Sequence, residues 1–421
     1  MSLSFEVKLR NYARIGLIHG LGFGQRPRPL YIDGYQTEDH GGFVAVLAEE
    51  AYRLGVETVD LRCRDPKLER AMFRGAPENF RLYEPKWVTE RAKEIVSRDG
   101  ARIALKGNGD LGVMDDVDSK YPSMFQASYL KANEPYTSRR RAGLQPWTIL
   151  DVPTIAWANK LGLSIEELWD FLFHITGADL EDPFVFVSEV DESLQRRSWK
   201  LNELMSKGMR MLHFIGGNGE EGDTSLMVGL SPRAKWCGGS KLSEDGTRFE
   251  ANLPSFEVFT TPDWRKTEGV VKVTMPSSLN GPIVDGLKVY FREGRVVDFQ
   301  ADVGEEAFRA LINQDVGAAQ LGEIALVGLD SPLAQYKNPH YCTLLDENKR
   351  CHMAFGNGYP SAIRGGAKVA KEELRELGCN ESEVHEDMMI SDEKTTVWAC
   401  DEDGRELALL IEDGRWTESF L

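Results

Sequence analysis

The sequence predicts an α+β protein, with an N-terminal α/β domain built on a parallel sheet and a C-terminal domain that is mainly antiparallel β. The first half alternates strand-like and helix-like segments, a pattern typical of parallel βαβ units. The second half has short apolar runs joined by turns, which favours antiparallel hairpins. We place the boundary after Ile215, giving an α/β domain over residues 1–215 and a β-rich domain over residues 216–421.

Length and charge limit the class of protein. A chain of 421 residues exceeds what one hydrophobic core usually supports, which agrees with two domains. The formal net charge of −17 argues against nucleic-acid and anionic-membrane partners, because both need clustered lysine and arginine. The six cysteines include no CxxC pair, and the N-terminus lacks the pattern of a secretion signal. We therefore expect a cytoplasmic, soluble protein with reduced thiols.

Apolar periodicity predicts the elements of the first half. Helices are expected over residues 4–21, 43–54, 87–96, 155–161 and 194–205, and after the capping box Ser164–Glu167; strands are expected over 30–32, 57–63, 102–105 and 211–215.

One motif in this half, Gly107 to Gly112, matches the pattern GxGxxG. Asp115 and Asp116 follow it and place negative charge where a pyrophosphate needs positive potential. We therefore predict a turn there and no nucleotide cofactor.

The second half is predicted to be rich in strands. Strands are expected over residues 269–274 and 287–291, the latter turning into a hairpin with 296–300. A helix is expected over residues 305–312, and two Asp-Gly turns, at Asp403 and Asp413, lie between apolar runs near the C-terminus.

Two clusters in this half carry metal-binding side chains. His352 follows Glu347 by five residues, and His385 and Asp387 form a His-x-Asp tripeptide. Imidazole and carboxylate together suit divalent transition metals. Small and apolar neighbours indicate that both clusters are buried, where a carboxylate without a partner is costly. A single histidine of this kind is more often an ordinary core residue, but two clusters favour a metal site.

These residues resemble the metallo-aminopeptidase family of aminopeptidase T and aminopeptidase S. Four blocks match in order, Asn252–Pro262, Leu321–Ala325, Asp346–Gly356 and His385–Ile390. The resemblance is strongest from about residue 250 onward and extends weakly over the rest of the chain. The first block has Phe256 where the family usually has a glutamate, leaving Glu257 as its only candidate ligand.

The resemblance implies a catalytic site for hydrolysing N-terminal residues from short peptides. Its implied metal ligands are Glu257, Glu323, Glu347, His352, His385 and Asp387. Six donors exceed the three protein ligands of a usual hydrolytic zinc site and suit two divalent ions (Zn, Co, Mn or Mg). Catalytic roles fall to Glu323, which would bridge both ions, and to Tyr359, which would donate to the oxyanion. The resemblance also implies a homodimer.

A second hypothesis comes from another class of enzyme. His352, His385 and Asp387 alone form the two-histidine, one-carboxylate set of mononuclear non-haem Fe(II) oxygenases, and a group of ring-cleaving pyridine dioxygenases resembles the peptidase family at these positions. The additional glutamates favour two metals and hydrolysis. A binding protein without catalysis would be expected to have lost some of these ligands.

Overall fold

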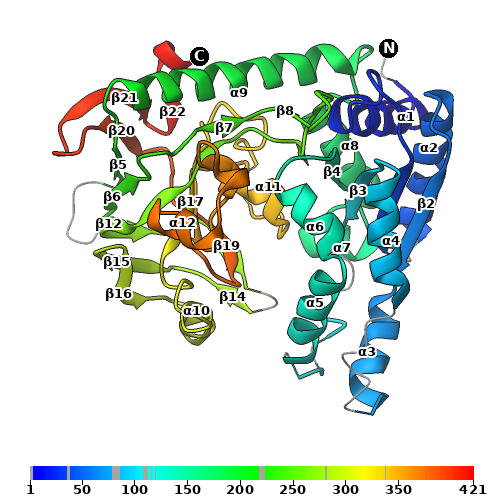
Figure 1. The fold of residues 1–421 in the computed structure, drawn as a ribbon, viewed down its shortest axis with the longest axis horizontal. Helices are drawn as coiled ribbons and strands as arrows, with labels where there is room; N and C mark the ends of the chain where they lie inside the picture. The colour runs from blue at the N-terminus through cyan, green and yellow to red at the C-terminus, as the bar shows by residue number, and fades with distance from the viewer. Residues whose placement is uncertain are drawn as a thin grey trace. The chain divides into compact units, whose positions relative to one another are not determined.

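The computed structural model describes residues 3–35, 38–77, 86–107, 112–114, 116–118, 120–217, 223–279, 282–336 and 338–421. The chain forms two compact units (Figure 1). Unit 1 contains residues 1–189 and 240–254, and unit 2 contains residues 190–239 and 255–421. Most of the predicted turn at Gly107 to Gly112 lies outside the described residues.

Unit 1 is built on a five-stranded parallel sheet with the order β10-β4-β3-β1-β2. Its strands are β1 (Leu30–Tyr35), β2 (Val59–Arg64), β3 (Ala101–Lys106), β4 (Trp147–Asp151) and β10 (Asn252–Leu253). Strand β10 belongs to residues 240–254, the second segment of unit 1. The same segment also forms the antiparallel pair of β8 (Lys241–Leu242) and β9 (Arg248–Phe249).

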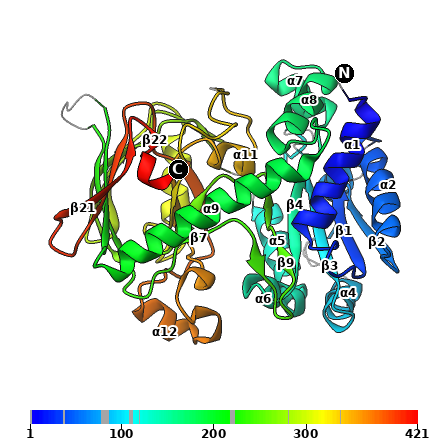
Figure 2. The same cartoon turned by 90° about the horizontal axis from the view of Figure 1, so that it is seen from above.

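Helices cover both faces of this sheet (Figure 2). Side chains of α1, α2 and α8 pack against Ile32, Ile103 and Leu105, whereas Tyr31, which points to the opposite face, packs against α4 and α6. The helical elements are α1 (Phe5–Arg14), the π-helix η1 (Ile15–Gly20), α2 (Glu38–Arg53), α3 (Pro66–Gly75), α4 (Lys86–Ser97), α5 (Lys120–Ala132), α6 (Glu134–Arg141), α7 (Ile155–Leu161) and α8 (Ile165–Thr176). The predicted capping box of Ser164 and Glu167 starts α8. The long helix α9 (Pro183–Ser206) starts in unit 1 and continues into unit 2.

Unit 2 contains two main antiparallel sheets. The larger has the order β16-β15-β12-β6-β5-β20-β21-β22 and the smaller the order β19-β18-β17-β11-β7. The strands of the larger sheet are β5 (Met211–Ile215), β6 (Ser225–Leu230), β12 (Pro262–Lys272), β15 (Lys288–Arg292), β16 (Arg295–Gln300), β20 (Thr396–Cys400), β21 (Glu406–Glu412) and β22 (Arg415–Trp416). Those of the smaller sheet are β7 (Cys237–Gly238), β11 (Val258–Thr260), β17 (Leu321–Leu326), β18 (His352–Gly356) and β19 (His385–Met389).

Both sheets contribute to one core. Phe214, Val228 and Val289 of the larger sheet belong to the same buried cluster as Ile324 and Phe355 of the smaller one. The remaining elements of unit 2 are β13 (Ser277–Ser278), β14 (Ile283–Val284), α10 (Glu305–Ile312), α11 (Thr343–Glu347), η3 (Pro360–Ala362), η4 (Gly366–Lys368), α12 (Lys371–Glu376) and η5 (Glu418–Phe420). The smaller sheet thus has one face in the core, and its other face can carry polar residues.

The predicted fold class is confirmed, since a parallel α/β layer is followed by a mainly antiparallel region. The predicted boundary after Ile215 differs from the division between the two units at residue 189. The strand β5 pairs with β6 and β20, so its hydrogen bonds lie in unit 2. The composition shift towards glycine begins only after this strand, and therefore marks the boundary too late.

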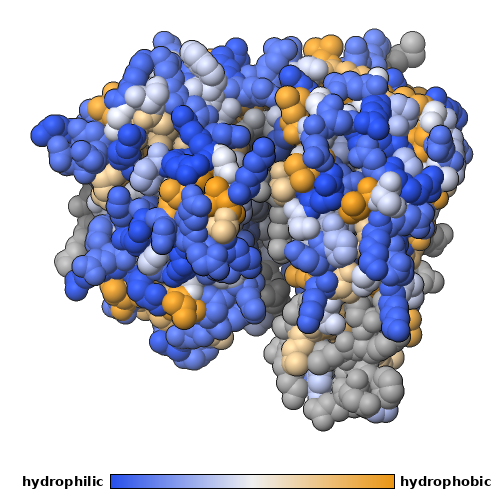
Figure 3. All heavy atoms as spheres, in the orientation of Figure 1, coloured by the Kyte–Doolittle hydropathy of each residue, from blue (hydrophilic) through white to orange (hydrophobic). Residues whose placement is uncertain are grey.

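The surface agrees with the charged composition. Hydrophilic side chains dominate the face shown in Figure 3. Across the described residues, none of the helices combines the length and the apolar character needed to cross a membrane.

Candidate metal centre

The smaller sheet of unit 2 positions the candidate ligands. Ala354 of β18 lies between Glu323 of β17 and Asp387 of β19 in register, and Gly356 pairs with His385. Because successive side chains of a strand point to opposite faces, the candidate ligands Glu323, His352, His385 and Asp387 share one face. The intervening residues Ile324, Met353, Phe355 and Met388 belong to the core. This alternation explains why polar and apolar residues are mixed in the local sequence.

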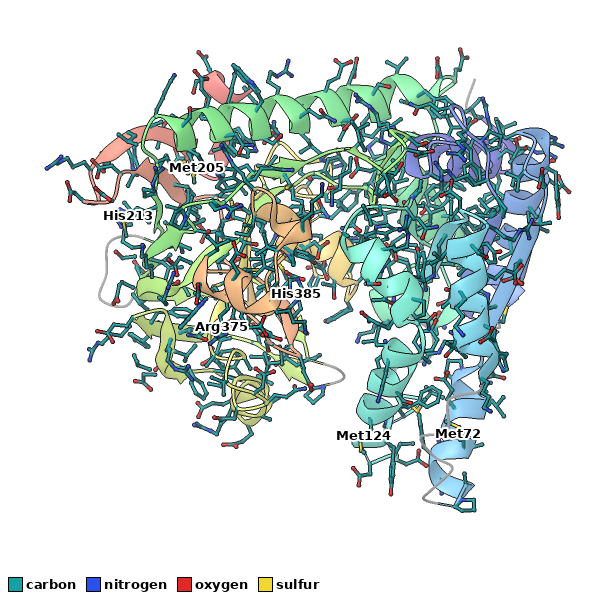
Figure 4. The ribbon with its side chains drawn as sticks, in the orientation of Figure 1. Met72, Met124, Met205, His213, Arg375 and His385 are labelled. Carbon is teal, nitrogen blue, oxygen red and sulfur yellow. The ribbon has the colours of Figure 1, made fainter. Side chains whose placement is uncertain are left out.

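Five of the six predicted donors form two groups that share Glu323. One group contains Glu257, Glu323 and His352, and the other contains Glu323, His385 and Asp387; within each group the ligand atoms lie within 4.8 Å of one another. His352 Nε2 lies 3.1 Å from Glu257 Oε2, and His385 Nε2 lies 3.3 Å from Glu323 Oε2. His385, at the start of β19, is labelled in Figure 4.

The second nitrogen of each imidazole contacts a backbone carbonyl. His352 Nδ1 lies 3.2 Å from the Arg350 carbonyl oxygen, and His385 Nδ1 lies 2.8 Å from that of Asn357. A carbonyl oxygen only accepts, so each Nδ1 donates a proton, which leaves Nε2 as the nitrogen that would bind a metal ion, as in metal-binding histidines. Asp387 Oδ1 is buried and has no hydrogen-bond partner in the described part of the chain. These residues fit divalent cations.

The charges of the cluster shift the pKa values of its members. Burial, with the nearby charges of Asp387 and Glu257, raises the pKa of Glu323 to about 6. Burial lowers the pKa of both histidines, but contacts with carboxylates outweigh it. The result is a pKa of about 9 for His352 beside Glu257, and of about 10 for His385 beside Asp387 and Glu323. The cluster therefore attracts positive charge strongly.

Tyr359 lies beside this cluster, on the segment between β18 and η3. Its hydroxyl is 3.2 Å from His385 Nε2, and the two rings meet edge to face with centroids 5.0 Å apart. Burial of the hydroxyl, together with the surrounding carboxylates, raises the pKa of Tyr359 well above its usual value. The phenol therefore stays protonated and able to donate at neutral pH.

Glu347, the sixth predicted donor, belongs to neither group of ligand atoms. It is a buried residue at the end of α11, and its charge is among those that raise the pKa of Tyr359. The structure thus places Glu347 within electrostatic range of the tyrosine. Asn357 was not predicted, because it contributes only its backbone carbonyl and no side-chain pattern marks such a role.

The fold and the buried carboxylate and imidazole groups define a metal-dependent enzyme. Residues 5–416 match the family model of the thermophilic metalloproteases (M29), and the chain belongs to this family. It is a metal-dependent peptidase, and the resemblance proposed from the sequence is confirmed.

Curated relatives match along nearly the whole chain. Aminopeptidase T of Thermus thermophilus is 34% identical over 419 residues, covering 98% of this chain and 99% of the relative. Aminopeptidase AmpS of Bacillus subtilis is 31% identical over 421 residues, covering 98% of this chain and 99% of the relative.

Two solved structures share the fold. Wild-type AmpT from Thermus thermophilus has a TM-score of 0.88 at 31% identity, covering 98% of this chain and all of the other. The 2,5-dihydroxypyridine dioxygenase from Pseudomonas putida has a TM-score of 0.53 at 10% identity, covering 98% of this chain and 96% of the other. The second likeness shows only that the fold is shared.

Proposed function

We propose that the protein is an aminopeptidase that releases N-terminal residues from short peptides at a centre of two divalent ions. The observation that carries the proposal is the pair of ligand groups joined by Glu323. Five side chains would hold the ions, namely Glu257, Glu323, His352, His385 and Asp387, with Glu347 as the sixth donor. When bound, two such ions polarise the scissile carbonyl and lower the pKa of a bound water, which favours attack at neutral pH.

Side chains of the protein would place the ions, stabilise the oxyanion and bind the α-amino group of the substrate. Glu323 fixes the spacing of the two ligand groups because its carboxylate belongs to both. Tyr359 has a protonated hydroxyl beside His385, so it can donate a hydrogen bond to the oxyanion that develops on the substrate. The clustered carboxylates favour a positively charged α-amino group, which supports an exopeptidase rather than an endopeptidase.

The glutamates argue against the mononuclear iron hypothesis. A site of His352, His385 and Asp387 alone would not need Glu257 or Glu323, yet both lie within the ligand groups. The preference for short peptides and the homodimeric state rest on the family resemblance, the cytoplasmic location rests on the cysteine pattern and the N-terminal sequence, and all three belong to this proposal. Light scattering on the purified protein measures the oligomeric state directly.

The test combines metal analysis with hydrolysis of aminoacyl anilides and short peptides. We expect close to two divalent ions per chain, loss of hydrolysis after chelation, and recovery when Co²⁺, Zn²⁺, Mn²⁺ or Mg²⁺ is returned. Acetylation of the substrate's amino terminus should abolish cleavage, because a blocked amine carries no charge and cannot bind a metal. Equal rates on free and acetylated peptides would contradict the exopeptidase assignment, and full turnover by protein shown to be metal-free would contradict the metal centre.

A further inference from the structure

We propose that Thr261 is a positioning residue that holds Tyr359 in place at the metal centre. The Thr261 hydroxyl donates a hydrogen bond to the Tyr359 carbonyl at 3.1 Å and accepts one from the Tyr359 N–H at 3.2 Å. One side chain thus binds both backbone groups of the tyrosine. The inference rests on the proposed function, because it concerns how Tyr359 is presented to a substrate.

Tyr359 needs such support because it lies outside the regular strands. It follows β18 by three residues and precedes η3, and although its hydroxyl is buried among the carboxylates the residue as a whole is 39% exposed. Its carbonyl also accepts the N–H of Ala362 at 2.9 Å, but that bond lies within the same short segment and does not attach it to the sheets. The bonds to Thr261 attach the backbone of Tyr359 to a rigid part of the fold.

Thr261 is itself well fixed. It is fully buried and lies between the end of β11 and the start of β12, where the chain passes from the smaller sheet to the larger. Strands on both sides of it are hydrogen-bonded to neighbours in their own sheets. The hydroxyl is therefore placed by the strand backbone, which makes it a stable anchor for the loop.

The aromatic ring of Tyr359 is also held in place, by contacts with two neighbouring side chains. Phe259, two residues before Thr261, meets the Tyr359 ring edge to face with centroids 5.5 Å apart, and His385 meets it at 5.0 Å. The ring lies against both side chains, with its hydroxyl near His385 Nε2. A shift of the Tyr359 backbone would carry this hydroxyl away from the reacting atoms while leaving the metal ligands in place.

The test compares Thr261→Val, which removes the hydroxyl at similar volume, with Thr261→Ser, which keeps it. Misplacement of a catalytic group by roughly 1 Å costs on the order of 10²-fold in rate, so we expect Thr261→Val to lower kcat by about 10- to 100-fold at full metal loading. KM should stay within about twofold, because the change affects transition-state contacts. Thr261→Ser should restore kcat to within about threefold of wild type.

The matched control is Thr260→Val. Thr260 is equally buried, and its hydroxyl donates to the Lys235 carbonyl at 3.1 Å, so the variant loses a similar bond away from the backbone of Tyr359. It should keep the kcat of wild type. A readout independent of activity comes from amide hydrogen exchange in metal-free protein, where Thr261→Val alone should speed exchange of the segment from residue 359 to 363.

A double variant distinguishes a loss of Tyr359 positioning from a general disturbance of the structure. If Thr261 acts through the tyrosine, Thr261→Val added to Tyr359→Phe should lower kcat little beyond Tyr359→Phe alone. Additive losses, a loss of metal in Thr261→Val, or unchanged exchange of the segment would overturn the proposal. If wild type cleaves no peptide, the proposed function fails, whereas the exchange experiment still decides whether Thr261 holds the loop.

Discussion

The Glu323 carboxylate lies 3.3 Å from Nε2 of His385 and is also within the ligand group that contains His352. No other residue of the described chain belongs to both ligand groups. Glu323 is held in β17 between two paired neighbours, β11 and β18, so the strand backbone sets its position. The geometry makes Glu323 the residue whose replacement best separates a two-metal site from a one-metal site.

Glu323→Gln should lower both metal content and peptidase activity. The amide carries no charge and supplies a weaker ligand to each ion, while repulsion between the two cations is less well offset. We expect metal content to fall from two ions per chain to one or none, and the peptidase rate to fall by orders of magnitude. Elemental analysis and rates on one peptide, with both proteins loaded identically, provide the measurement.

Glu386→Gln is the matched control for this change. Glu386 lies between His385 and Asp387 in β19, and strand alternation turns its side chain to the other face of the sheet. It should keep two ions and activity close to wild type. One tightly held iron in wild type and in Glu323→Gln, with ring cleavage and without peptide hydrolysis, would favour the dioxygenase hypothesis instead.

Local patterns in the sequence predicted much of this arrangement, and contacts between distant segments account for the rest. The His-x-Asp spacing of His385 and Asp387 places both side chains on one face of a strand, which a period of two dictates. The approach of Glu257 to His352 depends on the pairing of β11 with β17 and of β17 with β18, and spacing along the chain does not reveal it. The role inferred for Thr261 was missed for the same reason, since its partner is 98 residues away.

Glu347 lies next to a buried ion pair that we expect to stabilise its segment. The Asp346 carboxylate lies 3.0 Å from Lys349 Nζ and accepts the backbone N–H of His340 at 2.8 Å. Asp346→Asn removes the charged partner of Lys349, which is 1% exposed and keeps only the Asn338 carbonyl, at 2.6 Å, as an acceptor among the described contacts. Breaking a buried pair on one side costs about 3–5 kcal/mol, so the free energy of unfolding should fall by that order.

Denaturant unfolding of metal-free protein measures the loss caused by Asp346→Asn. The informative comparison is the double variant Asp346→Asn with Lys349→Met, in which no charge is left without a partner. It should recover much of the stability lost in the single variant, giving a large coupling free energy between the two positions. If the losses in free energy of unfolding of the two single variants simply add in the double variant, the charges of Asp346 and Lys349 do not stabilise each other.

His40 in unit 1 should make the stability of the protein depend on pH. The residue is 1% exposed, and burial lowers the pKa of its imidazole from 6.5 to about 4. Between these two values the unfolded chain binds a proton that the folded chain does not. Above about pH 6.5 the imidazole is neutral in both states and does not reduce the free energy of unfolding. As the pH falls towards 4, protonation of the unfolded chain lowers this free energy by a total of about 3 kcal/mol.

The measurement is the free energy of unfolding in chelator at a series of pH values from 7.5 down to 4.5, for wild type and for His40→Asn. Other groups titrate in both proteins, so the difference between the two curves isolates the contribution of His40. Asparagine does not titrate, and the variant should lose less stability than wild type as the pH falls, by up to about 1.4 kcal/mol per pH unit. Parallel curves would show that the imidazole of His40 titrates alike in the folded and unfolded chains, contrary to the burial seen here.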